Sequence, residues 1–271
     1  MRPAGARGPG PGVRAHDGRG FEHRAREPLC KATCVELFAG TAGIARAFAS
    51  RGWRVYSYEI DRDVNEDVMS REAGDFFDKL LESCETVFFW AGITCASWSR
   101  ARRGRPGPGG WPEPLRDDCA HLMGLPNLTQ KDCERVRLGN LQAAWLVRLI
   151  KKCVRASVPI VVENPASSRL WIYLDKFAPL ATANVVFNQC MFGTPYKKPT
   201  RLRGWNLQLA ELERRCHGKE LCERSGSQHV VLSGTDAGAS KGFKTAAASP
   251  YPLELCQAVV RTVMLQRPKS P

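Results

Sequence analysis

Residues 35–61 read VELFAGTAGIARAFASRGWRVYSYEID, and this stretch decides the fold. Around its start the apolar run Cys34–Phe38 is typical of a buried strand, and a glycine turn leads from it into a helix expected over Gly43–Arg51. A second strand, Arg54–Tyr58, follows and ends at the acidic Glu59. A strand, a helix and a second strand in this order predict a parallel β-α-β unit.

The same alternation continues along the chain. Helical spacing at residues 76–81 is followed by an apolar strand at Thr86–Trp90, a long helix over about Gln130–Ala156, strands at Pro159–Glu163 and Val185–Cys190, and a last helix beginning near Pro252. We therefore expect an α/β fold with a mostly parallel sheet and helices on both of its faces.

Composition narrows the classes of protein. The hydrophobic fraction of 43% favours a folded chain, and the absence of an apolar run of ~18 residues argues against a membrane span. A net charge of +13 favours a polyanionic partner, above all nucleic acid, although charge that serves only solubility is the alternative. The eleven cysteines, an odd number scattered through expected helices and strands, indicate buried thiols in a reducing, intracellular compartment.

The chain divides into four parts by composition. Residues 1–28 are rich in Gly, Pro and Arg and predict a disordered basic arm, from which nuclear residence is our expectation. Residues 29–203 form the main α/β domain, and residues 204–247 form a small polar insert containing Cys and His. Residues 248–271 hold a helix expected to return to the main domain.

The glycine turn indicates a cofactor site. Gly40 and Gly43 allow a tight turn and close backbone approach, and the helix that follows offers free N–H groups. About 20 residues further on, Glu59 ends the second strand, where a carboxylate suits a ribose diol. An adenosyl cofactor is the functional interpretation, and a plain turn followed by a surface acid is the structural one.

Two further strand ends carry chemistry. Thr86–Trp90, which we count as the fourth strand, runs into GITCASWS at residues 92–99, and the strand Pro159–Glu163 runs into ENP at residues 163–165. The carboxyl ends of parallel strands meet at one edge of a sheet, so Cys95 could serve there as a nucleophile beside Glu163. A lone cysteine is more often structural, but a second motif on the next strand favours catalysis.

These motifs, in this order over about Val35–Val263, resemble the DNA cytosine-5 methyltransferase family. The resemblance implies a Rossmann-like methyltransferase fold that binds S-adenosylmethionine. Phe38, Gly40 and Gly43 then line the methionine part of the cofactor, Glu59 holds the ribose, and an acid lies near the adenine, either Asp67 or, as second choice, Asp75. The cofactor-binding residues implied are Phe38, Ala39, Gly40, Thr41, Gly43, Glu59, Ile60 and Asp67.

The resemblance also assigns catalytic roles. The family's nucleophile motif is Gly-x-Pro-Cys followed by an aromatic residue and Ser, and here only the proline differs, being Thr94. Its Glu-Asn pair, whose glutamate contacts N3 of the flipped cytosine, corresponds to Glu163 and Asn164. Its third motif corresponds to CMFGTPYKKPTRL at residues 190–202, where Lys198 or Arg201 takes the place of the family's arginines.

The segment after Cys95 is rich in arginine, glycine and proline. In the family the corresponding loop closes over DNA whose target base is flipped out, and arginines there suit phosphate contacts. A solvated loop is the alternative. The candidate nucleic-acid contacts are Ser99, Arg100, Arg102, Arg103 and Arg105, with Arg116 at the far end of the loop.

The short insert holds Cys216, Cys222 and His229, residue types that could bind zinc, with Cys190 as a further ligand. The five-residue gap between the two cysteines is wider than usual for zinc, so ordinary buried cysteines are the favoured interpretation. The family usually carries a larger target-recognition region here, which suggests weak sequence recognition or dependence on a partner.

The leading hypothesis is S-adenosylmethionine-dependent methyl transfer to C5 of cytosine in DNA through a covalent Cys95 adduct. Two alternatives stay open. One is a nucleic-acid-binding protein that keeps the fold but has lost efficient chemistry, which Thr94 and the altered basic motif would permit. The other is an RNA cytosine-5 methyltransferase, because the chemistry at C5 is shared.

Overall fold

The structure is a computed structural model that describes residues 32–83, 85–102, 113–232 and 248–266. At its centre is a six-stranded sheet with the strand order β2-β1-β3-β4-β6-β5. The strands are β1 (Thr33–Leu37), β2 (Arg54–Tyr58), β3 (Val87–Ala91), β4 (Ile160–Pro165), β5 (Ala183–Asn188) and β6 (Pro199–Trp205).

The sheet is mostly parallel. Strands β2, β1, β3 and β4 pair in parallel, and β6 pairs antiparallel with both β4 and β5. Only β6 therefore runs against the others in this sheet. The predicted α/β class with a mostly parallel sheet is confirmed, while β6 was not predicted as a strand, and residue 203, the predicted end of the main domain, lies inside it.

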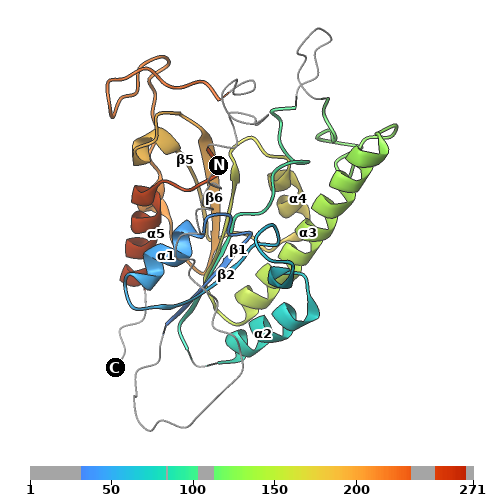
Figure 1. The fold of residues 1–271 in the computed structure, drawn as a ribbon, viewed down its shortest axis with the longest axis vertical. Coiled ribbons are helices and arrows are strands. Elements are labelled where there is room, and N and C mark those ends of the chain that lie inside the picture. Colours follow the sequence, from blue (N-terminus) through green and yellow to red (C-terminus); the bar gives the residue numbers. More distant parts are fainter. Residues whose placement is uncertain (1–31, 84, 103–112, 233–247, 267–271) are drawn as a thin grey trace, which may run out of the picture.

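Helices cover both faces of the sheet (Figure 1). On one face lie α1 (Gly43–Ala49) and α5 (Leu253–Leu265), packed on apolar side chains of the strands such as Phe88 and Val161. On the other face lie α2 (Arg71–Glu82), α3 (Gln130–Arg155) and α4 (Leu170–Phe177). The arrangement is a three-layer sandwich whose two cores lie on either side of the sheet.

The long helix α3 matches its prediction almost residue for residue. The Thr129 side chain caps its first turn by accepting a hydrogen bond from the Asp132 N–H at 3.2 Å. Apolar residues at helical spacing, including Leu146 and Ile150, are completely buried against the sheet. After the helix, Ser157 adopts a positive φ of 56°, which turns the chain back toward β4.

The order of the strands reverses between β1 and β3. From β1 the chain moves to β2 on one side, and later it returns to β3 and β4 on the other side. In sheets of this kind a crevice opens at the carboxyl ends of the two central strands, where ligands bind. The strand that leads to Cys95 is β3, the third along the chain, and not the fourth as predicted. Between β2 and β3 the chain forms no further strand but a short 3-10 helix, η1 (Val64–Glu66), and then α2.

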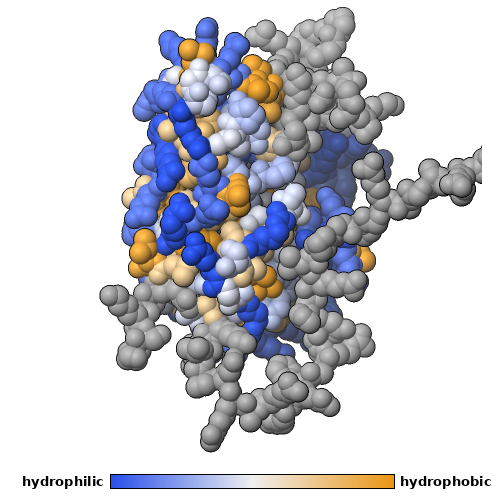
Figure 2. Space-filling view, turned by 60° about the vertical axis from the view of Figure 1, so that its left-hand side comes forward, coloured by the Kyte–Doolittle hydropathy of each residue, from blue (hydrophilic) through white to orange (hydrophobic). Residues whose placement is uncertain are grey.

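Figure 2 shows the side that bears α1 and α5, where hydrophilic areas separate smaller hydrophobic ones. Among the described residues, no helix combines the length and the apolar character needed to cross a membrane.

Candidate functional site

The loop after β1 has a conformation that only a few residue types adopt easily. Phe38, Gly40 and Ala42 have positive φ angles of 55°, 51° and 54°. The Ala39 N–H donates to Tyr58 O at 2.9 Å, and the Gly40 N–H donates to the Glu59 carboxylate at 2.6 Å. The loop is thus fastened to the end of β2, and it brings Ala39 and Gly40 next to Glu59, three of the residues predicted for the cofactor site.

Glu36 on β1 also holds the chain next to this loop, a role that was not predicted. Its buried carboxylate accepts a hydrogen bond from the Ala45 N–H at 2.7 Å, in the first turn of α1. Burial raises the pKa of Glu36 to about 7, against the opposing effect of the N–H groups of Ala45 and Ile44. The signal in the sequence was an acid inside an otherwise apolar strand.

The outer rim of the loop is open. Thr41 and Gly40 are exposed, and a Cβ atom placed on Gly40 would meet nothing within 4 Å. Ile60 is apolar and 51% exposed beside Glu59, and its contact with a cofactor stays a prediction.

The two acids predicted to lie near the adenine, Asp67 and Asp75, follow Glu59 and Ile60 in the sequence, and neither lies at the end of a strand. Asp67 follows η1 and accepts a hydrogen bond from the Met69 N–H at 2.9 Å. Asp75 lies on α2 with its carboxylate 3.8 Å from Arg71, and it is largely exposed. The contact of either acid with adenine stays a prediction.

The predicted cofactor loop and the predicted nucleophile loop meet at Gly92. The Gly92 N–H donates to Leu37 O at 3.1 Å, so the segment after β3 continues beside the end of β1. A Cβ atom on Gly92 would collide with the Tyr251 hydroxyl and would lie 3.5 Å from Phe38 O. Only glycine therefore fits at this contact.

Cys95 lies just beyond this contact, half-buried and free of disulfide bonding. It is close enough to Glu163 and Lys198 for both charges to change its pKa. Burial raises the pKa of Cys95, Glu163 raises it further, and Lys198 lowers it. The predicted nucleophile, acid and base-pocket lysine thus share one site at the carboxyl edge of the sheet.

Glu163 is 8% exposed and has a partner that was not predicted. The Tyr251 hydroxyl, which comes from the segment before α5, donates to the Glu163 carboxylate at 2.9 Å. Burial raises the pKa of Glu163, while Lys198 and the Tyr251 hydrogen bond lower it. The Lys198 ammonium is in turn held by Ala248 O at 2.5 Å.

Asn164 and Arg201 lie apart from this group. The Asn164 amide donates to Ile93 O at 2.7 Å and so ties the end of β4 to the loop that carries Cys95. Arg201 lies over the ring of Trp171 on α4 at 5.6 Å. Of the two residues predicted to support the base pocket, it is Lys198 whose charge acts on Cys95 and Glu163.

Arg116 has a different role from the predicted one. It is buried, and its guanidinium lies 3.6 Å from the centre of the Trp98 ring. It donates hydrogen bonds to the side chains of Ser97 and Asn140 and to three nearby backbone carbonyls. Burial lowers its pKa to about 10. Arg116 therefore cannot reach a phosphate, and instead it holds the segment after Cys95 against α3.

The remaining predicted nucleic-acid contacts are near the surface or outside the described residues. Arg100 pairs with Asp118 at 2.6 Å, and Arg102 pairs with Asp132 at 3.4 Å. Ser99 accepts a hydrogen bond from the Ala101 N–H at 3.1 Å. Arg103, Arg105 and the basic arm at residues 1–28 lie outside the described residues.

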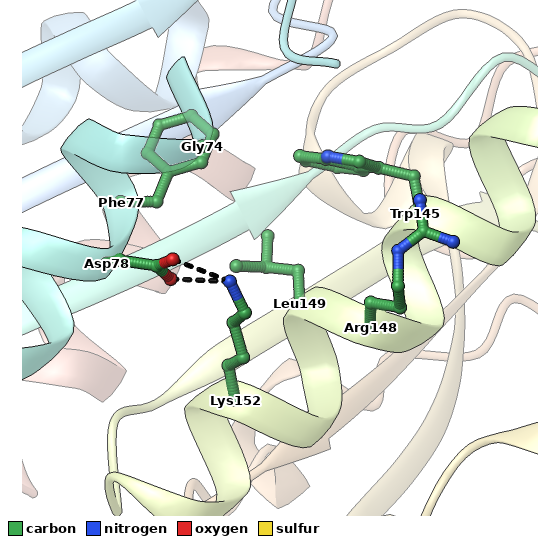
Figure 3. A pocket seen from close by; sticks show the side chains of 7 residues that line it. All are labelled: Gly74, Phe77, Asp78, Trp145, Arg148, Leu149 and Lys152. Atoms are coloured by element: carbon green, nitrogen blue, oxygen red, sulfur yellow. Dashed lines mark hydrogen bonds and ion pairs between the residues drawn. The ribbon is translucent and has the colours of Figure 1, made fainter. Parts of the chain in front are cut away.

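The Cys and His residues considered for zinc come together in the fold. The ligand atoms of Cys190, Cys216, Cys222 and His229 all lie within 4.8 Å of one another. Separately, a depression of about 100 Å³ lies between α2 and α3, and Lys152 pairs there with Asp78 at 2.6 Å. Figure 3 shows the side chains that line it. Ligand pockets usually measure ~300–1,000 Å³, so this depression is too small for a nucleoside cofactor.

No protein-family model matches the chain, and no curated protein matches it.

Proposed function

We propose that the protein is an S-adenosylmethionine-dependent methyltransferase that modifies C5 of cytosine in DNA. One observation carries the proposal: Cys95, Glu163 and Lys198 interact at the carboxyl edge of the sheet, directly beside the loop that Glu59 fastens. This edge flanks the point where the strand order reverses. Cys95 and Glu163 are far apart in the sequence, and the neighbouring strands β3 and β4 bring them to the same edge.

The residues around the loop fit an adenosyl cofactor. The positive φ of Gly40 and the free space around its Cα leave room for a ligand to approach the backbone closely. Glu59 would hold the ribose hydroxyls, and the exposed Ile60 would contact the base. When bound, S-adenosylmethionine supplies the methyl group.

The charges of the site suit attack on a pyrimidine. A buried Glu163 with a raised pKa favours the protonated form, which can donate a hydrogen bond to N3 of cytosine. The same protonation removes the negative charge that disfavours a Cys95 thiolate, and Lys198 stabilises that thiolate further. Cys95 Sγ then bonds to C6, C5 becomes nucleophilic and accepts the methyl group, and loss of the C5 proton to a base releases Cys95.

A decisive experiment uses DNA containing 5-fluorocytosine together with S-adenosylmethionine. Fluorine cannot leave as a proton does, so the Cys95 adduct should persist as a band of lower mobility in a denaturing gel. Cys95→Ser should abolish this band, whereas Cys119→Ser, which removes an exposed cysteine, should retain it. The proposal fails if the wild-type protein gives no adduct, or if the adduct survives in Cys95→Ser.

One observation favours a second candidate function, a nucleic-acid-binding protein with weak or no chemistry. Burial and Glu163 both raise the pKa of Cys95, so the thiol is poorly ionised without substrate. DNA binding without an adduct would support this candidate. An adduct formed with 5-fluorocytidine in RNA, and not with DNA, would instead assign the same chemistry to RNA.

A further inference from the structure

Four potential metal ligands converge beside the connection between β5 and β6. Cys190 lies in the 3-10 helix η2 (Gln189–Phe192), and the other three come from the segment after β6. The ligand atoms lie within 4.8 Å of one another, and Cys216 Sγ is 3.6 Å from His229 Nε2. We call Cys190, Cys216, Cys222 and His229 the Cys/His cluster.

These separations match those of a tetrahedral zinc site. Zinc binds thiolate sulfur at about 2.3 Å and imidazole nitrogen at about 2.0–2.1 Å. A tetrahedron with these bonds has sulfur–nitrogen edges of about 3.6 Å and sulfur–sulfur edges of about 3.8 Å. The observed Cys216–His229 separation equals the first value, and the 4.8 Å limit leaves at most about 1 Å of adjustment for the others.

Ordinary hydrophobic packing does not account for the cluster. Between residues 213 and 232, Cys216 and Cys222 are the only buried residues, so this segment has no apolar core of its own. The three cysteines form a small separate cluster, with Met191 packed beside it. Small segments without a core usually depend on a disulfide or a metal, and one disulfide would leave a third cysteine and the histidine unexplained.

The histidine also lacks an alternative role. Its Nδ1 atom is buried without a hydrogen-bond partner in the described part of the chain, and Nε2 on the other side of the ring faces Cys216 Sγ. The backbone holds it in place, because the His229 N–H donates to Glu220 O at 3.0 Å. A coordinate bond to a metal would fix the imidazole that the protein alone leaves weakly held.

We propose that Cys190, Cys216, Cys222 and His229 bind one zinc ion, which fastens residues 213–232 to the connection between β5 and β6. Three thiolates and one imidazole are a ligand set typical of structural zinc. The fastened segment also contacts the stretch before β6, where Lys197 Nζ donates to Gly218 O at 2.9 Å. The zinc site thereby braces the backbone next to Lys198.

The test measures metal in the full-length protein, purified under reducing conditions and passed over a desalting column. We expect about one zinc ion per chain by mass spectrometry. Cobalt substitution should give the visible absorption of a tetrahedral site and charge-transfer bands from thiolate. Cys222→Ser and His229→Ala should each hold less than about a tenth of the wild-type zinc. Cys133→Ser, an exposed cysteine outside the cluster, should keep the full content.

A further variant, His229→Cys, shows whether loss of zinc in Cys222→Ser and His229→Ala comes from the missing ligand or from misfolding. His229→Cys supplies a fourth thiolate, so it should retain the metal and strengthen the thiolate-to-cobalt charge-transfer bands. A folded, fully reduced wild-type protein that holds no zinc and takes up no cobalt would overturn the proposal. So would a disulfide within the cluster of the protein purified without reductant, or unchanged cobalt bands in His229→Cys. None of these readouts depends on methyl transfer.

Discussion

Replacing Arg116 by methionine should destabilise the protein far more than its place in an arginine-rich loop suggests. Methionine keeps much of the apolar contact with Trp98 but removes every hydrogen bond of the guanidinium. Three backbone carbonyls, those of Ser97, Leu122 and Val136, then lose a buried donor, as do the side chains of Ser97 and Asn140. The two side chains can turn to other partners, whereas the carbonyls cannot.

The magnitude follows from these contacts. Each buried group left without a partner costs about 1–3 kcal/mol, and the lost cation–π contact adds about 1 kcal/mol. Relief of the buried charge offsets part of this sum, so we expect a net loss of about 3–5 kcal/mol in the free energy of unfolding. For a domain of this size that loss corresponds to about 10 °C in Tm.

Urea denaturation followed by circular dichroism measures this loss, with Arg100→Met as the matched control. Arg100 lies in the same segment and pairs with Asp118 at the surface, so its removal should cost less than about 1 kcal/mol. Equal costs for the two variants would refute the structural role of Arg116. In that case Arg116 would be free to serve as the DNA contact predicted from the sequence.

Three further predictions concern the proposed site. Tyr251→Phe removes a hydrogen bond that favours the ionised form of Glu163 and so lowers its raised pKa. The lost hydrogen bond should cost about 1.5–3 kcal/mol where Glu163 is ionised, and less where it is protonated, so the cost should be larger at about pH 8 than at about pH 4. Urea titrations at the two pH values test this, and an equal cost would contradict it. Gly92→Ala forces a methyl group onto the Tyr251 hydroxyl and should lower the free energy of unfolding by about 1–3 kcal/mol. Thermal melting should show a smaller loss when Gly92→Ala is made in the Tyr251→Phe protein, which lacks this hydroxyl. Strictly additive losses would argue against the contact. Glu59→Gln should weaken binding of S-adenosylhomocysteine about tenfold in isothermal titration calorimetry, whereas Asp61→Asn should leave it nearly unchanged; equal effects would remove Glu59 from the cofactor site.

Elements with a strong local signal were predicted well. The strand β2 has its predicted bounds, and α3 ends one residue from its predicted end. Both have an apolar pattern of the right period, and the side chain of Thr129 marks the start of α3. The glycine turn after β1 was found for the same reason, since positive φ angles require specific residues.

Elements stabilised by distant partners were missed. The sequence PTRLRGW of β6 places two arginines in a strand, which breaks the usual apolar pattern. In the fold, Arg203 pairs with Asp175 at 2.7 Å and lies 5.2 Å from the Trp171 ring, both on α4. The helix α4 itself is short and apolar on most sides, so it has little periodicity.

The same distinction between local signals and distant partners applies to the residues of the candidate site. Cys95 and Glu163 follow apolar strands, so their meeting at one edge of the sheet could be predicted from strand order alone. Tyr251 reaches Glu163 across 88 positions of sequence, and nothing around it distinguishes it from an ordinary aromatic residue. Arg116 was misassigned because the Trp98 ring and the backbone carbonyls that hold it become neighbours only after folding.

The antiparallel strand β6 has a consequence for how the protein is made on the ribosome. It is inserted between β4 and β5, although both precede it in the chain. During synthesis the edge of β4 therefore waits without its final neighbour, and β5 has no partner in the sheet until about residue 205 has emerged. An unpaired edge can recruit strands of other chains, so pausing of translation just before β6 should be the most aggregation-prone moment in the life of the nascent chain.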